Sequence, residues 1–117
     1  MSDIINEIET ELLALQDEKY RDFSASLVPT LDKNSFIGVR SPELRKLAKK
    51  YAKDERIEAF LSALPHKYQE ENTLHGFIIS LEKDFDKAIA ETERFLPYIN
   101  YTVRFAMGML MRHFLDE

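Results

Sequence analysis

The sequence predicts an all-α fold, and two observations support this prediction. Apolar residues recur at spacings of three and four along most of the 117 residues, as they do on one face of a helix. Only 3 Gly and 4 Pro are present, which leaves little material for the many tight turns of an all-β protein. The length suits one hydrophobic core, so a single domain covering residues 1–117 is expected.

The first two helices are predicted from an apolar stripe and from a capping residue. Asp17 is expected to cap the second helix, which would place Tyr20, Phe23 and Leu27 on one side. A loop from Leu31 to Arg40 would follow. The stripe of the first helix consists of Ile4, Ile5, Ile8, Leu12 and Leu15.

The third helix has a well-defined start at Ser41-Pro42-Glu43. Serine can accept from free backbone N–H groups, proline suits the first helical position, and glutamate favours the helix dipole. The inward residues that continue this helix are Leu44, Leu47, Ala48 and Tyr51.

Four further helices are predicted over 56–64, over 67–81, after a cap at Asp84, and from about Tyr101 onwards. The aromatic residues expected in the core are Phe23, Phe77, Phe85 and Phe95. About seven short helices with brief connectors favour a HEAT-like α-solenoid, in which antiparallel helix pairs stack on one another. Periodicity alone does not separate this solenoid from an irregular helical bundle, which is the less favoured alternative.

The composition excludes several classes of protein. With no cysteine, disulfides, zinc fingers and thiol catalysis are excluded. No apolar run approaches the roughly 18 to 20 residues that span a bilayer, and Met1 to Thr10 is too acidic for a signal peptide. We therefore expect a cytoplasmic protein with no membrane contact and no cofactor. The net charge of −5 requires any nucleic-acid site to be a local basic patch.

Such a patch is predicted between Arg40 and Lys53, where Glu43 is the only acidic residue before the helix ends. Lysines at positions 46, 49, 50 and 53 would share one helical face and could meet phosphates, although a solvated lysine face is the common alternative. The candidate DNA-binding residues are Arg40, Arg45, Lys46, Lys49, Lys50 and Lys53.

Arg104 is a further candidate, because it falls at the border of the apolar face of the last predicted helix, one turn before Gly108. A charge there must reach either water or a partner. Glu71 and His75 stand four residues apart and could bind a metal. Two ligands without a third favour a surface pair or a core histidine instead, so no metal site is expected.

Three stretches of this sequence resemble the DNA alkylation repair (AlkD-like) family of HEAT-repeat DNA glycosylases. They run from Tyr20 to Arg45, from Leu64 to His75, and from Phe95 to Gly108, and the string Gly-Val-Arg-Ser-Pro-Glu-Leu-Arg at 38–45 is the most specific. This sequence departs from the family pattern at Asn100-Tyr101. There the resemblance implies an Asn-Trp motif, an aspartate and roughly one further repeat unit, none of which is present.

The resemblance implies a protein that binds alkylated double-stranded DNA and excises N3- or N7-alkylated purines. It assigns the catalytic carboxylate and a tryptophan to the absent motif, so no catalytic residue is identified in this chain and impaired excision is expected. It also implies that Arg104 contacts the DNA backbone. Two alternatives remain open, a non-catalytic DNA-binding scaffold and a helical protein–protein interaction module. Apolar faces left uncovered by the missing segment would favour self-association.

Overall fold

The computed structural model describes residues 4–98, and every regular element in this range is a helix. The all-α prediction is therefore confirmed. The predicted helix from Tyr101, with Arg104 and the Asn100-Tyr101 junction, lies outside the described residues. The elements are α1 (Ile4–Ala14), α2 (Glu18–Leu27), η1 (Lys33–Ser35), α3 (Ser41–Tyr51), α4 (Ile57–Ser62), α5 (Gln69–Ser80), α6 (Phe85–Phe95) and η2 (Leu96–Tyr98), where η denotes a short 3₁₀ helix.

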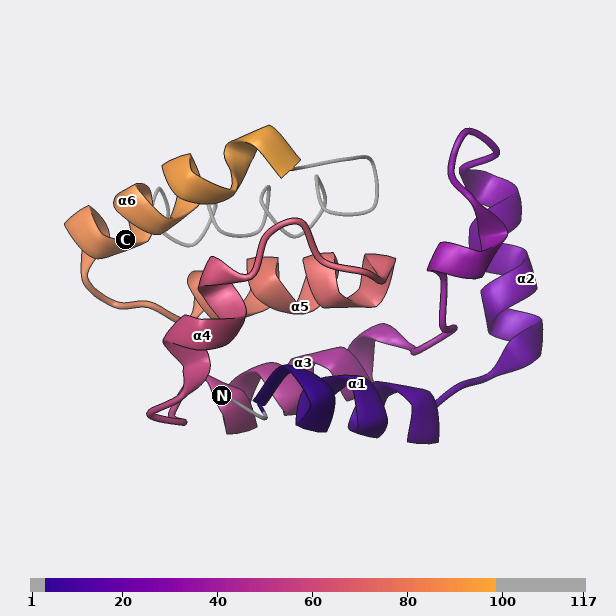
Figure 1. Ribbon diagram of the computed structural model, residues 1–117, viewed down its shortest axis with the longest axis horizontal. Helices are drawn as coiled ribbons and strands as arrows, with labels where there is room; N and C mark the ends of the chain where they lie inside the picture. The colour runs from indigo at the N-terminus through magenta and orange to yellow at the C-terminus, as the bar shows by residue number, and fades with distance from the viewer. Residues whose placement is uncertain (1–3, 99–117) are drawn as a thin grey trace.

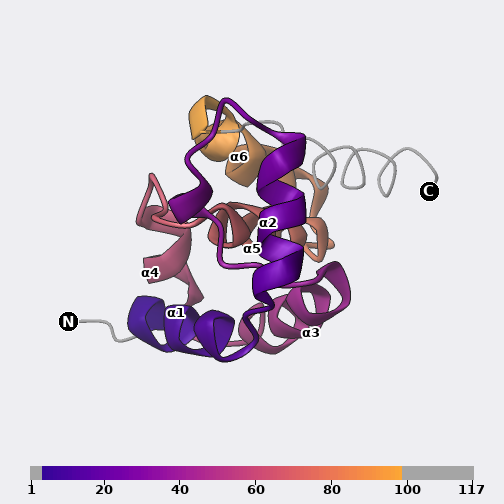
Figure 2. The ribbon, with the colours of Figure 1, turned by 90° about the vertical axis from the view of Figure 1, so that its right-hand side faces the viewer.

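The helices stack in layers. α3 packs most extensively on α5, α1 packs on α4, and α6 packs on α5. Figure 1 shows α3, α5 and α6 one above another, and Figure 2 shows α1 beside α3 at the base. This layering is compatible with a helical-repeat fold, in which each layer covers the apolar face of its neighbour.

The core lies between α1, α3, α4 and α5. The stripe predicted for the first helix is buried at Ile4, Ile8 and Leu12, whereas Leu15 lies beyond the end of α1 and is 36% exposed. Each large apolar side chain buried in this way stabilises the fold by about 1.5 to 3 kcal/mol. The aromatic side chains that α3, α4 and α5 bury in this core are Tyr51, Phe60 and Phe77, and Leu44 and Leu74 are buried beside them.

α2 stands apart from these layers. Asp17 caps it as predicted, because its carboxylate accepts the backbone N–H of Tyr20 at 3.1 Å. Ala25 is the one fully buried residue that the structure records in this helix. The prediction that Phe23 belongs to the core is wrong, since this side chain is 59% exposed, and Leu27 on the same side of the helix is 66% exposed. The stripe is exposed because α2 packs chiefly on the short helix η1 and not under another helix layer.

The prediction for α6 is confirmed in part. Asp84 caps the helix through the N–H of Lys87, and Ala88 and Phe95 are buried. Phe85 is wrongly predicted as core and is 55% exposed, because it occupies the first turn, where the helix emerges from a loop. Leu81, at the end of the predicted span 67–81, lies just past the end of α5 and is 40% exposed.

Within residues 4–98, no helix combines the length and the apolar character that crossing a membrane requires.

Candidate nucleic-acid interface

The basic residues predicted to bind DNA gather on and beside α3. This helix is strongly amphipathic, with Leu44, Leu47, Ala48 and Tyr51 buried and the basic side chains outside. Its start differs slightly from the prediction. Arg40 occupies the cap position, but its side chain forms no capping hydrogen bond with the helix, and Ser41 is already helical. The helix ends at Tyr51, so Lys53 lies in the following turn and does not extend the helical row as predicted.

The structure divides the basic row into two edges. On one edge, Lys50 forms an ion pair with Glu11 of α1, and Lys46 lies 3.7 Å from Glu43. Tyr51 donates towards the same acidic edge of α1, with its hydroxyl 2.8 Å from Glu11 and 3.0 Å from Glu7. Burial of the ring and these two carboxylates raise the pKa of Tyr51 above its ordinary value. Lys50 therefore helps to join α3 to α1.

The other edge of α3 is turned away from α1 and towards α5. Arg45 and Lys49 line a small hollow of about 130 Å³ together with Phe77, Ser80 and Leu81. The Arg45 guanidinium lies over the Phe77 ring, 5.0 Å from its centroid. Lys49 is exposed and forms no ion pair with another described residue. Lys49 is therefore the cationic group of this edge that is available to an anionic partner.

Arg40 marks the N-terminal end of the same region. Its guanidinium lies 4.7 Å from the centroid of the Tyr20 ring and 3.2 Å from the Asp17 carboxylate. Arg40 and the backbone N–H of Tyr20 both lower the pKa of Asp17 below its ordinary value, the backbone bond more strongly. Arg40 therefore connects α2 to the start of α3 as well as offering a positive charge.

The most specific string of the sequence, at 38–45, is held by a residue that sequence reasoning did not select. The carboxylate of Glu70, at the start of α5, accepts backbone N–H groups from Ile37 at 2.9 Å, Gly38 at 2.8 Å and Val39 at 3.4 Å. Glu70 is buried, so these bonds are shielded from water. They fix the loop before α3 against the N-terminus of α5 and thereby set the direction of the basic helix.

Gly38 is required at the centre of this loop. Its φ of +94° is a conformation that other residues rarely adopt. A Cβ at this position would lie 2.3 Å from the Asp17 carbonyl oxygen and 2.7 Å from the Arg21 Cβ. The glycine therefore lets the loop approach the start of α2 closely. In the sequence, the one sign of this close approach is the glycine at the start of the 38–45 string.

A crevice of about 150 Å³ lies between α2, α3 and α5. Its lining comes from segments 20–24, 36–44 and 69–77, and every lining residue except Phe77 falls within the first two stretches of resemblance. Figure 2 shows how α2 crosses in front of α3 and α5 at this end of the molecule. Phe77 lines both this crevice and the hollow beside Arg45, so the two are neighbours on one surface.

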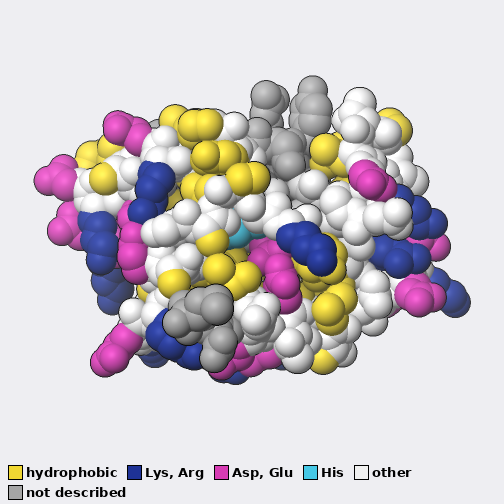
Figure 3. Space-filling model, viewed as in Figure 1, with side chains coloured by type: hydrophobic (Ala, Val, Ile, Leu, Met, Phe, Trp, Pro, Cys, Tyr) yellow, Lys and Arg dark blue, Asp and Glu magenta, His cyan; other side chains and the backbone are white. Residues whose placement is uncertain are grey.

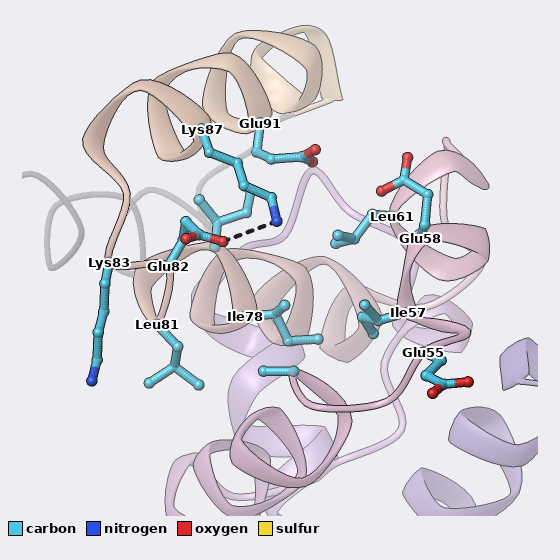
Figure 4. Close-up of a pocket in the computed structure, with 12 residues that line it drawn as sticks. Glu55, Ile57, Glu58, Leu61, Ile78, Leu81, Glu82, Lys83, Lys87 and Glu91 are labelled. Carbon is cyan, nitrogen blue, oxygen red and sulfur yellow. Dashed lines mark ion pairs between the residues drawn. The ribbon is translucent and has the colours of Figure 1, made fainter.

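A larger pocket, of about 400 Å³, lies between α4, α5 and α6 and is lined mainly by acidic and apolar side chains (Figure 4). Its floor is apolar, with Ile57, Leu61 and Ile78, and an ion pair of 3.4 Å joins Lys87 to Glu82 across it. Four glutamates line it against two lysines, which disfavours a phosphate backbone there. These residues are Glu55, Glu58, Glu82, Glu91, Lys83 and Lys87.

The buried polar groups of α5 serve the fold. Glu71 accepts the Tyr68 N–H at 3.0 Å in a capping box. Burial and the neighbouring Glu9 carboxyl raise the pKa of Glu71, and burial is the larger cause. The His75 Nδ1 lies 2.8 Å from the His66 Nε2, and burial lowers the pKa of both rings. The expectation of a core histidine at position 75 is confirmed, and no group of three potential metal ligands occurs within 4–98.

The surface seen in Figure 3 carries no continuous basic area. Lysine and arginine side chains alternate there with aspartate and glutamate, and α3 lies behind α1 in this view. The face seen in Figure 3 therefore offers no extended basic surface.

Comparison with known proteins decides the family. A model of the DNA alkylation repair enzyme family matches residues 8–113, which is most of the chain. The chain belongs to the DNA alkylation repair enzyme family. Neither the curated proteins nor the solved structures contained a match. The family assignment confirms the resemblance and supports a general role in DNA alkylation repair. It gives a reason to expect DNA at the basic edge of α3.

Proposed function

We propose that this member of the DNA alkylation repair family binds duplex DNA containing N3- or N7-alkylated purines along the α3–α5 edge. The observation that carries the proposal is the position of Arg45 and Lys49. Both lie on the edge of α3 away from acidic α1, beside the loop that Glu70 holds in place. Lys53 and Arg40 add positive charge near this edge, Lys46 adds charge on the neighbouring edge of α3, and Arg104 is the further contact that the family resemblance implies.

The proposal also concerns whether the protein excises the alkylated base. An alkylated purine carries positive charge, so its glycosidic bond is weak and its departure leaves an oxocarbenium-like sugar. A carboxylate beside the sugar stabilises that cation. The sequence contains no tryptophan and lacks the Asn-Trp and aspartate motif that the resemblance assigns to this step. We therefore expect DNA recognition with impaired excision, as in a DNA-binding scaffold of the same fold.

The binding proposal is tested by reversing the charge at Lys49. Fluorescence anisotropy with a duplex that contains 7-methylguanine should show binding weakened by roughly fivefold to tenfold, and the salt slope should fall by about one or two phosphate contacts. Lys83→Glu is the matched control, because Lys83 is also exposed but lies at the acidic pocket. Equal binding by the two variants would contradict the α3 interface.

The excision proposal is tested on the same duplex by measuring release of 7-methylguanine. The expected result is binding without appreciable release. Rapid multiple-turnover release would show that the chain carries a catalytic group other than the absent motif, and the impairment would be rejected.

The exposed stripe on α2 favours a second candidate function, a helical protein–protein interaction module. Phe23 and Leu27 lie four residues apart on one face, and both are more than half exposed. Self-association through this stripe would appear in sedimentation velocity as a concentration-dependent dimer, which Phe23→Ser with Leu27→Ser should abolish. A monomer that binds no DNA at low salt would leave binding to a different protein as the better candidate.

A further inference from the structure

We propose that copies of this chain associate head to tail, with the exposed stripe of α2 from one copy lying in the pocket between α4, α5 and α6 of the next. The stripe consists of Lys19, Phe23 and Leu27, and the pocket is the one drawn in Figure 4. This inference rests on the second candidate function above, because it names the surface that covers the stripe. The cationic side chains of Arg45 and Lys49 do not line this pocket.

The α2 stripe carries a cation beside two apolar side chains. Lys19, Phe23 and Leu27 are spaced four residues apart along α2, so they lie on one face of the helix. All three are exposed, and Lys19 forms no ion pair with another described residue. The acid nearest to the stripe in sequence, Asp22, is paired with Lys33 at 2.8 Å. The stripe therefore presents positive charge and apolar surface together.

The pocket offers apolar surface to such a stripe. Leu81, just past the end of α5, is 40% exposed, and Ile57 is half-buried. Leu61 and Ile78 are only 7% and 6% exposed, so they close the floor and present little surface of their own. A volume of about 400 Å³ has room for a large side chain such as Phe23. Burying that ring against Leu81 would remove apolar area from water on both copies.

The rim of the pocket supplies the opposite charge. Figure 4 shows the carboxylates of Glu58 on α4 and Glu91 on α6 pointing toward each other. Arg94 pairs with both of them, and its distance to Glu58 is 2.8 Å. Two carboxylates thus share one guanidinium, which leaves one negative charge over. Because each carboxylate can accept several hydrogen bonds, the Lys19 ammonium of a neighbouring copy can join this group.

The other charged residues of the pocket do not reverse this balance. Lys87 pairs with Glu82 at 3.4 Å, and Lys83 extends away from the other lining side chains in Figure 4. Glu55 is exposed and forms no ion pair with another residue that the structure describes. The pocket therefore favours a cationic occupant with an apolar neighbour, which is the chemistry of the α2 stripe.

The two surfaces lie toward opposite ends of the molecule. In Figure 1, α2 stands at one end of the long axis, and α4 and α6 lie toward the other end. A contact between two different surfaces is heterologous, so each copy that joins leaves a free stripe and a free pocket for the next. A symmetric dimer, in which α2 packs on the partner's α2, would bring neither the rim carboxylates nor Leu81 into the contact.

A pair of variants tests the head-to-tail contact by sedimentation velocity. Phe23→Ser with Leu27→Ser removes the stripe and keeps the pocket, whereas Leu81→Lys alters the pocket and keeps the stripe. Each variant alone should self-associate roughly tenfold more weakly than the unaltered protein. An equimolar mixture should form a dimer and no larger species, because one intact stripe meets one intact pocket. The unaltered protein should form dimers and then larger species as its concentration rises.

Leu13→Lys is the matched control for the pocket variant. Leu13 is 47% exposed on α1 and does not line the pocket, so this variant should self-associate like the unaltered protein. If Leu81→Lys melts early, Glu58→Lys supplies a second pocket variant. The Glu58 side chain is 64% exposed, and a lysine there would repel Lys19 of the neighbouring copy.

Three results would overturn the proposal. If the pocket variant associates as tightly as the unaltered protein, the stripe binds another surface, such as α2 of the partner. If the equimolar mixture stays monomeric, the stripe and the pocket do not bind each other. If the unaltered protein is monomeric at millimolar concentration, self-association itself fails, and a different protein becomes the better candidate for the stripe.

These failures are distinguishable from failure of the DNA-binding proposal. Phe23→Ser with Leu27→Ser should bind a duplex long enough for one copy within twofold of the unaltered protein, since neither residue belongs to the α3 edge. Lys49→Glu should weaken duplex binding and leave self-association unchanged.

Discussion

Glu70 and Gly38 show how single residues set the geometry of this protein. Glu70 collects three backbone N–H groups from positions 31 to 33 residues earlier in the chain. Gly38 supplies the positive φ that allows those N–H groups to converge. Hydrogen bonds to a buried charged group contribute more than neutral ones, and an orphaned partner costs the full desolvation penalty. The loop is therefore a structural joint between the two family strings that line the crevice.

The first prediction concerns this joint. Gly38→Ala should lower the free energy of unfolding by about 2 to 3 kcal/mol, because the new methyl group is strained at this φ and collides with Asp17 and Arg21. Urea unfolding monitored by circular dichroism measures the loss. Glu70→Ala should destabilise the same loop, so the double variant should lose less than the sum of the single changes. Full additivity would contradict a shared joint.

At the scale of the element, α2 is the least supported of the helices described over residues 4–98. It has a good cap at Asp17, but its apolar stripe faces outwards and Arg40 is one of its few side-chain links to α3. Elements with few buried contacts open at low free energy. α2 also forms one wall of the crevice beside α3 and α5.

The second prediction compares two identical changes on different helices. Phe60→Ala on α4 removes a ring with no exposed surface and should cost about 3 to 5 kcal/mol. Phe23→Ala on α2 removes a ring that is 59% exposed, so the cost should stay below about 1 kcal/mol. Thermal melting of both variants checks the difference. Comparable losses would mean that Phe23 is covered in solution, as self-association through α2 would require.

Helix positions could be predicted from the sequence, because caps and periodicity are local. Asp17 and Asp84 cap their helices as expected, and α3, α4 and α5 lie within a few residues of their predicted spans. The burial of Phe23 and Phe85 could not be predicted, since a helical wheel shows which side is apolar but not whether a neighbour covers it. The hydrogen bonds of Glu70 to the loop could not be predicted from the sequence either, because they connect segments more than 30 residues apart.

At the scale of the whole molecule, charge is unevenly distributed on an acidic body. Six basic residues and one acidic residue fall within 40–53, whereas the pocket between α4, α5 and α6 is lined by four glutamates and two lysines. Such asymmetry orients an approaching polyanion towards α3. Half of the candidate site follows from sequence, namely the basic row. The sequence did not predict that this row divides into two edges, because the division depends on α1, whose Glu11 forms an ion pair with Lys50. It did not predict the crevice either, because the crevice depends on the position of α2.

The last prediction concerns the pH dependence of stability. Burial lowers the pKa of His66 to about 4 and that of His75 to about 3, so below pH 6.5 the unfolded chain takes up two protons that the folded protein refuses. Stability from these rings is therefore lost as the pH falls below 6.5. Burial raises the pKa of Glu71 to about 8 from an ordinary value of 4.5, so the folded protein keeps a proton that the unfolded chain releases. That contribution is lost as the pH rises from 4.5 to about 8.

Between pH 4.5 and 6.5, the two histidines change the free energy of unfolding more steeply with pH than Glu71 does. Above pH 6.5, the Glu71 carboxyl makes the larger contribution to this change. The melting temperature should accordingly reach its maximum near pH 6.5 and fall towards pH 8. Glu71→Gln keeps an oxygen that can accept the Tyr68 N–H and removes the titration, so its melting temperature should exceed that of the unaltered protein at pH 8 and stay level from pH 6.5. Glu55→Gln, on an exposed turn, should reproduce the unaltered curve. A Glu71→Gln variant that melts lower at pH 8 would show that the ionised carboxylate stabilises the fold, which the burial of this side chain argues against.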